Sequence, residues 1–225
     1  MDEGIFQTLR ADIISHKLRP GQVIREDELA NRFGVSRTPI REMLRRLERE
    51  DLVEVIPNRG VFVSELTTRD IEEVLDIRLS LEPAAAWAAA KKMTDSQQAE
   101  LEEINRMLGS AVETQDSITS FEADSRLHDL ILDAAGNTRA RRIINNLMGQ
   151  ILRIRFISGH KPGRIDTTVA EQKELVAALL DRDPARAENL MRIHLKNAKD
   201  LLIPSTDMDR KFEEFLRNSL RPRPH

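Results

Sequence analysis

Residues 34–50 read Gly-Val-Ser-Arg-Thr-Pro-Ile-Arg-Glu-Met-Leu-Arg-Arg-Leu-Glu-Arg-Glu, and this stretch decides the fold of the N-terminal segment. Ser36 is a good N-cap, so we expect a helix from there to about Glu50. At about 100° per residue, one side of this helix collects the apolar residues. They are Ile40, Met43, Leu44 and Leu47. Most of the other side is arginine, so the pattern predicts a helix that buries one face and presents arginines on the other.

The flanking sequence predicts the rest of a small DNA-binding unit. A short helix is expected over Glu26–Phe33 and ends at Gly34. Two short helices joined by a glycine-containing turn are typical of a helix-turn-helix. Residues 52–56 and 61–63 are β-rich runs around a Pro-Asn-Arg-Gly turn, which indicates a hairpin. Arg59 lies at its tip, where a wing can insert it into a minor groove.

Arginine is the side chain suited to reading DNA. Its planar fork binds guanine edges or phosphate in bidentate fashion. Ser36, Arg37 and Thr38 begin the second helix and Arg41 follows one turn later, so they occupy the reading positions of a helix-turn-helix. Residues 32–49 hold six Arg against two Glu, a local charge of +4 on a chain with a net charge of −3. This cluster predicts a polyanion contact, the alternative being an ordinary solvated helix face.

The segment over about residues 4–66 resembles the winged helix-turn-helix of the GntR family of bacterial regulators. The matching blocks, in order, are residues 20–24 (PGQVI), 28–30 (ELA), 34–42 (GVSRTPIRE), 44–47 (LRRL), 51–53 (DLV) and 58–63 (NRGVFV). The resemblance implies that Arg37, Thr38, Arg41 and Arg45 contact double-stranded operator DNA. It also implies that Gly60 permits the turn of the wing.

The composition favours a mostly α-helical protein. The chain has 225 residues, of which 40% are hydrophobic and 32% charged. The absence of Cys excludes disulfides and thiolate metal sites. The longest uncharged stretch, residues 143–152, is ten residues long, against about 20 for a membrane helix. Because the N-terminus also lacks an apolar signal segment, we expect a cytoplasmic protein with no membrane partner.

From Thr67 onward the periodicity is helical, which predicts an all-α bundle over residues 67–203 after a winged helix-turn-helix domain over residues 1–66. Thr67 and Thr94 each begin a helix with a capping box, formed with Asp70 and Gln97. Further helices are expected over about 118–135, 138–158, 167–180 and 184–202. Pro83 is a site where the helix that begins at Thr67 can kink. The tail, residues 204–225, can form one more short helix.

Two histidines and an aspartate of the helical domain are candidate metal ligands. Asp124 and His128 are four residues apart and share a helix face, so both can reach one divalent ion. His194 lies on the last helix of the bundle. Taken singly, each His has an alternative interpretation as an ordinary surface or core residue.

The C-terminal half, over about residues 67–203, resembles the FCD-type effector domain of the FadR branch of the GntR family. The blocks that carry the likeness are residues 76–85, 121–131, 135–137 and 191–195. The resemblance implies a divalent metal such as Zn²⁺ or Ni²⁺, held by one Asp and three His beside a small carboxylate. Asp124, His128 and His194 match this set, and Gln172 stands at the fourth position. Since a Gln oxygen suits hard cations better, the alternative is a metal-free pocket where Gln172 hydrogen-bonds the ligand.

Arg78 and Glu82 are candidate effector-binding residues. They are four residues apart, which is also the spacing of a simple surface ion pair. The family resemblance implies that Arg78 clamps the effector carboxylate by the bidentate geometry that Arg favours. Arg153 or Arg155 could also face the cavity, and periodicity does not separate them.

The sequence therefore predicts a ligand-responsive transcriptional regulator rather than an enzyme. We expect a homodimer that binds a palindromic operator as a repressor and is released by a small organic acid. Two alternatives stay open. The first is a metal-dependent hydrolase using Asp124, His128 and His194, which leaves the arginine-rich helix unexplained. The second is a regulator without an effector, whose helical domain only dimerises.

Overall fold

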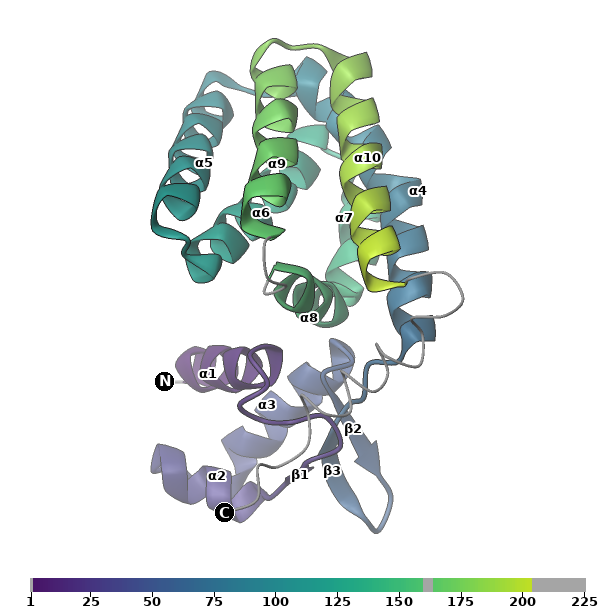
Figure 1. The fold of residues 1–225 in the computed structure, drawn as a ribbon. Coiled ribbons are helices and arrows are strands. Elements are labelled where there is room, and N and C mark those ends of the chain that lie inside the picture. The colour runs from purple at the N-terminus through teal and green to yellow at the C-terminus, as the bar shows by residue number, and fades with distance from the viewer. Residues whose placement is uncertain (1, 160–163, 204–225) are drawn as a thin grey trace.

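The computed structural model describes residues 2–159 and 164–203, arranged as a small α/β head below a bundle of helices (Figure 1). The elements are α1 (Asp2–Ile14), β1 (Val23–Ile24), α2 (Glu26–Phe33), α3 (Arg37–Arg49), β2 (Val53–Ile56), β3 (Gly60–Val63), α4 (Thr68–Lys92), α5 (Asp95–Thr114), α6 (Ser117–Ala135), α7 (Thr138–Asn146), α8 (Met148–Gly159), α9 (Arg164–Leu180) and α10 (Pro184–Leu202). The predicted class, a winged helix-turn-helix followed by an all-α bundle, is confirmed. The predicted tail and the loop at 160–163 lie outside the described residues.

The head has its own apolar core, formed by α1, α2, α3 and a three-stranded antiparallel sheet of order β1-β3-β2. The predicted hairpin is β2 and β3, with Val55 opposite Val61. The two-residue strand β1 was not predicted, because so short a run carries no period-2 signal of its own. It pairs Ile24 with Val61 and so closes the open edge of the wing.

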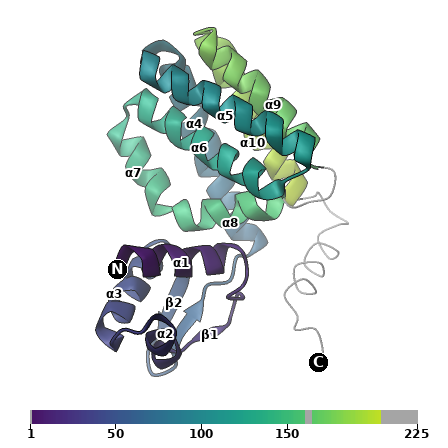
Figure 2. The ribbon, with the colours of Figure 1, turned by 90° about the vertical axis from the view of Figure 1, so that its left-hand side faces the viewer.

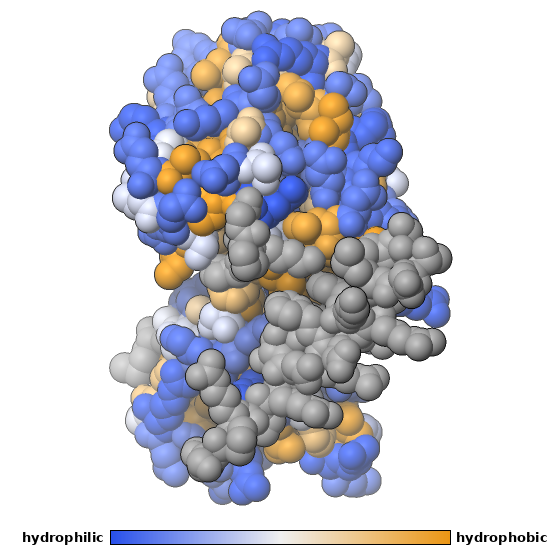
Figure 3. All heavy atoms as spheres, viewed as in Figure 1, coloured by the Kyte–Doolittle hydropathy of each residue, from blue (hydrophilic) through white to orange (hydrophobic). Residues whose placement is uncertain are grey.

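The bundle has a second core, to which α4–α10 contribute. Both predicted capping boxes are present: the side chains of Thr67 and Thr94 accept from the backbone N–H groups of Asp70 and Gln97. α4 is a single helix that continues through Pro83. Hydrophilic residues cover much of the face in Figure 3, with apolar patches on the bundle. Among the described helices, none combines the length and apolar character needed to cross a membrane.

The prediction of one helix over residues 138–158 was wrong. The chain forms two helices, α7 and α8, which meet at Leu147 and run in different directions (Figure 2). Asn145, Asn146 and Gly149 flank the junction at Leu147, and these stop signals were missed because none of them fixes a break by itself. The break allows α8 to cross under the bundle and pack on the head, a tertiary effect that local propensity does not encode.

α8 packs very closely on the head. Gly149 lies against the end of α3, where an added Cβ would overlap the carbonyl oxygen of Glu50 and come within 2.7 Å of Leu52 Cγ. Gln150 Nε2 donates to Asp51 Oδ2 at 3.1 Å. The absence of a side chain at Gly149 is therefore what sets the distance between the two domains.

The side chains of Arg153 and His16 meet near the same junction. Arg153 is 1% exposed, and its Nε and Nη1 have no hydrogen-bond partner among the described residues. His16, half-buried beside Phe156, follows α1 in a left-handed conformation at φ 59°. Burial and the charge of Arg153 lower the pKa of His16 to about 4.

Gly149→Ala should destabilise the protein by roughly 1–3 kcal/mol, because the new methyl group overlaps backbone that has to move. Gly109→Ala on α5 is the matched control, since a Cβ there meets only Lys173 Nζ, at 3.7 Å. It should be neutral or slightly stabilising, as Ala is the better helix former. Urea unfolding of the two variants measures the difference, and equal effects would contradict this account of the junction.

His16→Asn should flatten the pH dependence of stability. The folded pKa of His16, about 4, lies below the unfolded value of about 6.5, so the unfolded chain binds more protons between these values. The contribution of neutral His16 to the free energy of unfolding is present above pH 6.5 and is lost as the pH falls towards 4. Asn tolerates the left-handed conformation but has no charge to gain. Thermal unfolding from pH 7 to 4 should show a smaller loss in the variant, and parallel curves would contradict the assignment.

Candidate functional site

The helix α3 has the two faces that the sequence predicts. Ile40, Met43, Leu44 and Leu47 are buried in the head. Ser36, Arg37, Thr38, Arg41 and Arg45 are exposed. Ser36 is the N-cap, yet its side chain makes no capping hydrogen bond. The hydroxyl is therefore available to a phosphate or a base edge.

Two of the exposed arginines are paired with the acidic first turn of α2. Arg37 Nε lies 2.5 Å from Asp27 Oδ1, and Arg41 Nε lies 2.7 Å from Glu26 Oε2. These pairs are largely exposed, so each contributes little to stability. They hold the guanidinium groups in place along α3, where phosphate oxygens can compete for them.

Two other arginines of the cluster are paired within the head, although Arg32 is itself exposed. Arg46 binds Glu3 at 2.9 Å and covers the ring of Phe6 at 3.8 Å. Arg32 binds the buried Asp12 at 2.8 Å. The local charge of +4 is therefore larger than the positive charge that is free to bind DNA. Counting residues in the sequence could not reveal this.

The wing presents Arg59 at an exposed position in the turn between β2 and β3. Gly60 follows it with φ 111°, a conformation that a residue with a Cβ adopts only under strain. The structure thus supplies the physical reason for a glycine at the wing turn.

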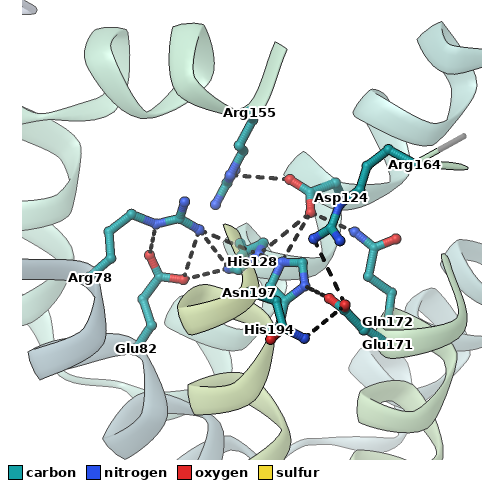
Figure 4. Close-up of polar contacts among 10 residues, drawn as sticks. All are labelled: Arg78, Glu82, Asp124, His128, Arg155, Arg164, Glu171, Gln172, His194 and Asn197. Atoms are coloured by element: carbon teal, nitrogen blue, oxygen red, sulfur yellow. Dashed lines mark hydrogen bonds and ion pairs between the residues drawn. The ribbon is translucent and has the colours of Figure 1, made fainter. Parts of the chain in front are cut away.

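A second group of polar residues is buried in the bundle (Figure 4). It draws on five helices: Arg78 and Glu82 on α4, Asp124 and His128 on α6, Arg155 on α8, Gln172 on α9 and His194 on α10. All are at most 8% exposed. Residues predicted from three separate sequence blocks are therefore brought together in one place.

Three potential ligand atoms converge at the centre of this group. Asp124 Oδ1 lies 3.6 Å from both His128 Nε2 and His194 Nε2, and the two nitrogens are 3.4 Å apart. Ligands held about 2.0–2.2 Å from a tetrahedral ion lie roughly 3.3–3.6 Å from one another. The triangle therefore has the dimensions of one face of a metal site.

Carboxylates hold the outer nitrogen of each imidazole. His128 Nδ1 donates to Glu82, and His194 Nδ1 donates to Glu171 Oε2 at 3.1 Å. This carboxylate–histidine arrangement fixes the tautomer and leaves the lone pair of each Nε2 pointing inward. Two such lone pairs and a carboxylate oxygen repel one another unless a proton or a cation lies between them.

Gln172 orients Asp124 in this arrangement. Its Nε2 donates to Asp124 Oδ1 at 2.5 Å, while its Oε1 is buried without a hydrogen-bond partner. Because a carboxylate can only accept, the amide nitrogen has to face Asp124. Gln172 therefore supports one ligand of the triangle.

The charges around the triangle balance. Three carboxylates (Glu82, Asp124 and Glu171) face three guanidinium groups (Arg78, Arg155 and Arg164). Burial raises the pKa of Asp124, but Arg155 and the two imidazoles outweigh it and hold that pKa well below its usual value. Burial lowers the pKa of His194, but Asp124 and Glu171 outweigh it and raise that pKa overall. The cluster thus attracts a positive charge to the centre of the triangle.

Two arginines lie beside the triangle. Arg78 holds Glu82 in a fork, with Nε 2.6 Å and Nη2 3.3 Å from the carboxylate oxygens. Arg155 Nε lies 3.2 Å from Asp124 Oδ2, without hydrogen-bond geometry. Both line a small cavity of about 30 Å³. Of the two arginines that periodicity could not separate, Arg155 faces the cavity and Arg153 faces the head.

Sequence reasoning missed the role of Glu171 in holding His194. A surface-type Glu beside a Gln on α9 gives no local signal, since its partner is 23 residues away on α10. Arg164, at the start of the same helix and 3.8 Å from Glu171, was also missed.

Comparison with known proteins agrees with this geometry. The model of bacterial regulatory proteins of the gntR family matches residues 2–63, and the FCD domain model matches residues 73–197. The chain belongs to the GntR family, and its helical domain is an FCD domain. It is therefore a DNA-binding transcriptional regulator, as predicted, and the hydrolase alternative is not supported.

One sequence relative and two solved structures show what this GntR regulator is similar to. The HTH-type transcriptional repressor RspR of Escherichia coli K12 is 29% identical over 200 residues, covering 89% of this chain and 88% of RspR. The structure of E. coli McbR/YncC has a TM-score of 0.73 at 21% identity and 98% coverage of both chains. The metal-free FCD domain of TM0439 has a TM-score of 0.53 at 19% identity, covering 68% of this chain and 99% of that one.

Arg41→Ala should weaken binding to a DNA fragment enriched from random sequence by the wild-type protein. A lost bidentate contact to a base corresponds to roughly 1–3 kcal/mol, or about 5- to 150-fold in Kd. Arg192→Ala, which removes an exposed arginine of α10, is the control and should bind like wild type. Fluorescence anisotropy at fixed salt measures both. Equal affinities for all three proteins would remove Arg41 from the interface.

Proposed function

We propose that this GntR regulator is a repressor whose FCD domain binds a divalent metal ion together with a small carboxylate, and which then leaves its operator. Asp124, His128 and His194 would hold the metal, with Zn²⁺ or Ni²⁺ favoured by the two imidazoles. When bound, the metal supplies a Lewis-acid anchor for one carboxylate oxygen of the effector. The observation that carries the proposal is the convergence of Asp124 Oδ1 and two Nε2 lone pairs on one point.

The charge balance supports an anionic effector. The three carboxylates and three guanidinium groups cancel, so a divalent cation would leave a buried excess of +2. A buried charge is stable only when it is paired, and a carboxylate ligand reduces this excess. Metal and acid should therefore bind with positive, reciprocal coupling.

Arg155 is the group of this chain best placed to receive the carboxylate. Its Nε makes no hydrogen bond and lies 3.2 Å from Asp124, a proposed metal ligand, whereas Arg78 is engaged by Glu82. Arg164 Nε is also without a hydrogen bond, but that arginine lies beside Glu171 at the outer edge of the cluster. We propose that Arg155 binds the effector. Arg78 and Glu82, predicted as effector-binding residues, would act mainly by holding His128.

The DNA-binding role is proposed for Ser36, Arg37, Thr38, Arg41 and Arg45 on α3 and for Arg59 and Gly60 on the wing. GntR regulators bind operator DNA and usually dimerise. We propose a homodimer on a palindromic operator, since a two-fold protein matches a two-fold site. The domain boundary near residue 66 also stays a proposal.

The small cavity favours a second candidate, a regulator without an effector. A space of about 30 Å³ has room for little more than a water or a carboxylate head group. In that case the buried cluster would be structural, and the domain would only dimerise.

Asp124→Asn should abolish or greatly weaken metal binding, because it removes the charged ligand of the triangle while keeping the shape of the side chain. Asp133→Asn, an exposed position on the same helix, is the matched control. Isothermal titration of chelator-stripped protein with Zn²⁺ and with Ni²⁺ measures the effect. A thermal-shift panel of mono- and dicarboxylates, with and without metal, then tests the coupling. Metal binding unchanged in Asp124→Asn would overturn the proposed site, and the absence of any acid-dependent shift would favour the effector-free regulator.

A further inference from the structure

A large cleft lies between the head and the bundle. It lies at the junction where α1 runs beside α8 (Figure 2). Its volume is about 930 Å³, within the range of ligand pockets. α1 forms one wall, and α6, α7 and α8 form the others. The apolar part of the lining consists of Ala11, Ile14, Ile118, Phe121, Met148, Leu152 and Phe156.

The cleft and the small inner cavity share two wall residues, Phe121 and Arg155. Arg155 is therefore in contact with both spaces, one side facing Asp124 and the other facing the cleft. Since the inner cavity is about 30 Å³, it can take the head group of a ligand but not its body. A ligand whose carboxylate reaches Arg155 has the cleft as the adjoining space for the rest of the molecule.

The other cations of the cleft are already paired. Arg10 binds Glu50 at 2.7 Å, Arg141 binds Asp129 at 3.0 Å, and Arg126 lies 3.5 Å from Glu100. Lys17 lies 3.7 Å from Asp12. Arg155 Nε also lies 3.2 Å from a carboxylate, Asp124 Oδ2 in the inner site, but it is buried and makes no hydrogen bond. The cleft thus combines an apolar wall with a guanidinium at its inner end that still has a donor to give.

We infer that this interdomain cleft binds the apolar body of the effector while the carboxylate of the same molecule reaches Arg155. The inference rests on the proposed function and makes the effector an amphipathic acid, with a hydrocarbon portion of several carbons. Such a ligand touches α1 of the head as well as the FCD domain. Because α1 packs directly on α3, a ligand in the cleft would affect the position of α3, the proposed DNA-reading helix.

The test uses full-length, metal-loaded protein and a series of straight-chain saturated acids from acetate to dodecanoate. Titration calorimetry gives Kd for each acid. Burial of the chain should tighten binding by roughly fourfold per methylene until the cleft is filled. Acetate, which reaches only the inner end, should bind weakly.

Ala11→Trp fills the cleft from the exposed side of α1 and should abolish the dependence on chain length while leaving acetate binding unchanged. Thr8→Trp is the matched control, because it adds the same ring to an exposed position of α1 outside the cleft lining. Gln7→Trp, a second position in the lining, gives an independent reading if Ala11→Trp does not fold.

The outcomes separate the two proposals. If acids of all lengths bind equally, or if both cleft variants keep the full dependence on length, the cleft inference is wrong and the metal-assisted carboxylate sensor stands. If no acid binds at any length, with or without metal, both are wrong. Length-dependent binding that both cleft variants abolish supports the inference.

Discussion

Two carboxylates, Glu82 and Glu171, turn two buried imidazoles so that their free nitrogens point at the same spot as Asp124. The polar interior of the FCD domain depends on this constraint. Buried carboxylates need partners, and Arg78 and Arg164 supply them from α4 and α9. The result is a network spanning five helices that is neutral as a whole but has electron-rich atoms at its centre. A purely apolar core would pack as well, so the network supports the proposed metal site.

α8 is the element through which this network reaches the DNA-binding head. One of its side chains, Arg155, contacts Asp124 in the site. Gly149 and Gln150, about one and a half turns earlier, contact the end of α3 and the turn that follows it. A shift of Arg155 towards a ligand therefore moves a rigid helix that is in contact with both domains. Because the packing at Gly149 is close, there is little free space in which α8 could move without moving the head.

Much of this organisation could be predicted from the sequence, and the failures have physical causes. The division of α3 into apolar and arginine faces follows from spacing alone, and the capping boxes of α4 and α5 are local signals. The ligand triangle was predicted from Asp124, His128 and His194 because its motifs resemble the FCD pattern. The break at Leu147 has local signals in Asn146 and Gly149 that the prediction passed over. The pairing of Glu171 with His194 depends on a contact between distant segments, which no local pattern encodes. The same holds for Arg46, whose contact with Phe6 and Glu3 across the head removes it from the DNA face.

The acidic first turn of α2 bears on how such a protein searches a chromosome. Asp27 and Glu26 offset part of the attraction between two reading arginines and any phosphate backbone. Sequence-independent affinity comes almost entirely from that attraction, and a genome offers a vast excess of wrong sites. Correct base edges can compensate for displacing the carboxylates, whereas a random sequence offers phosphates alone. If Arg37 and Arg41 read bases as proposed, the two ion pairs shorten the time spent on non-cognate DNA and leave more of the protein free to occupy its own operator.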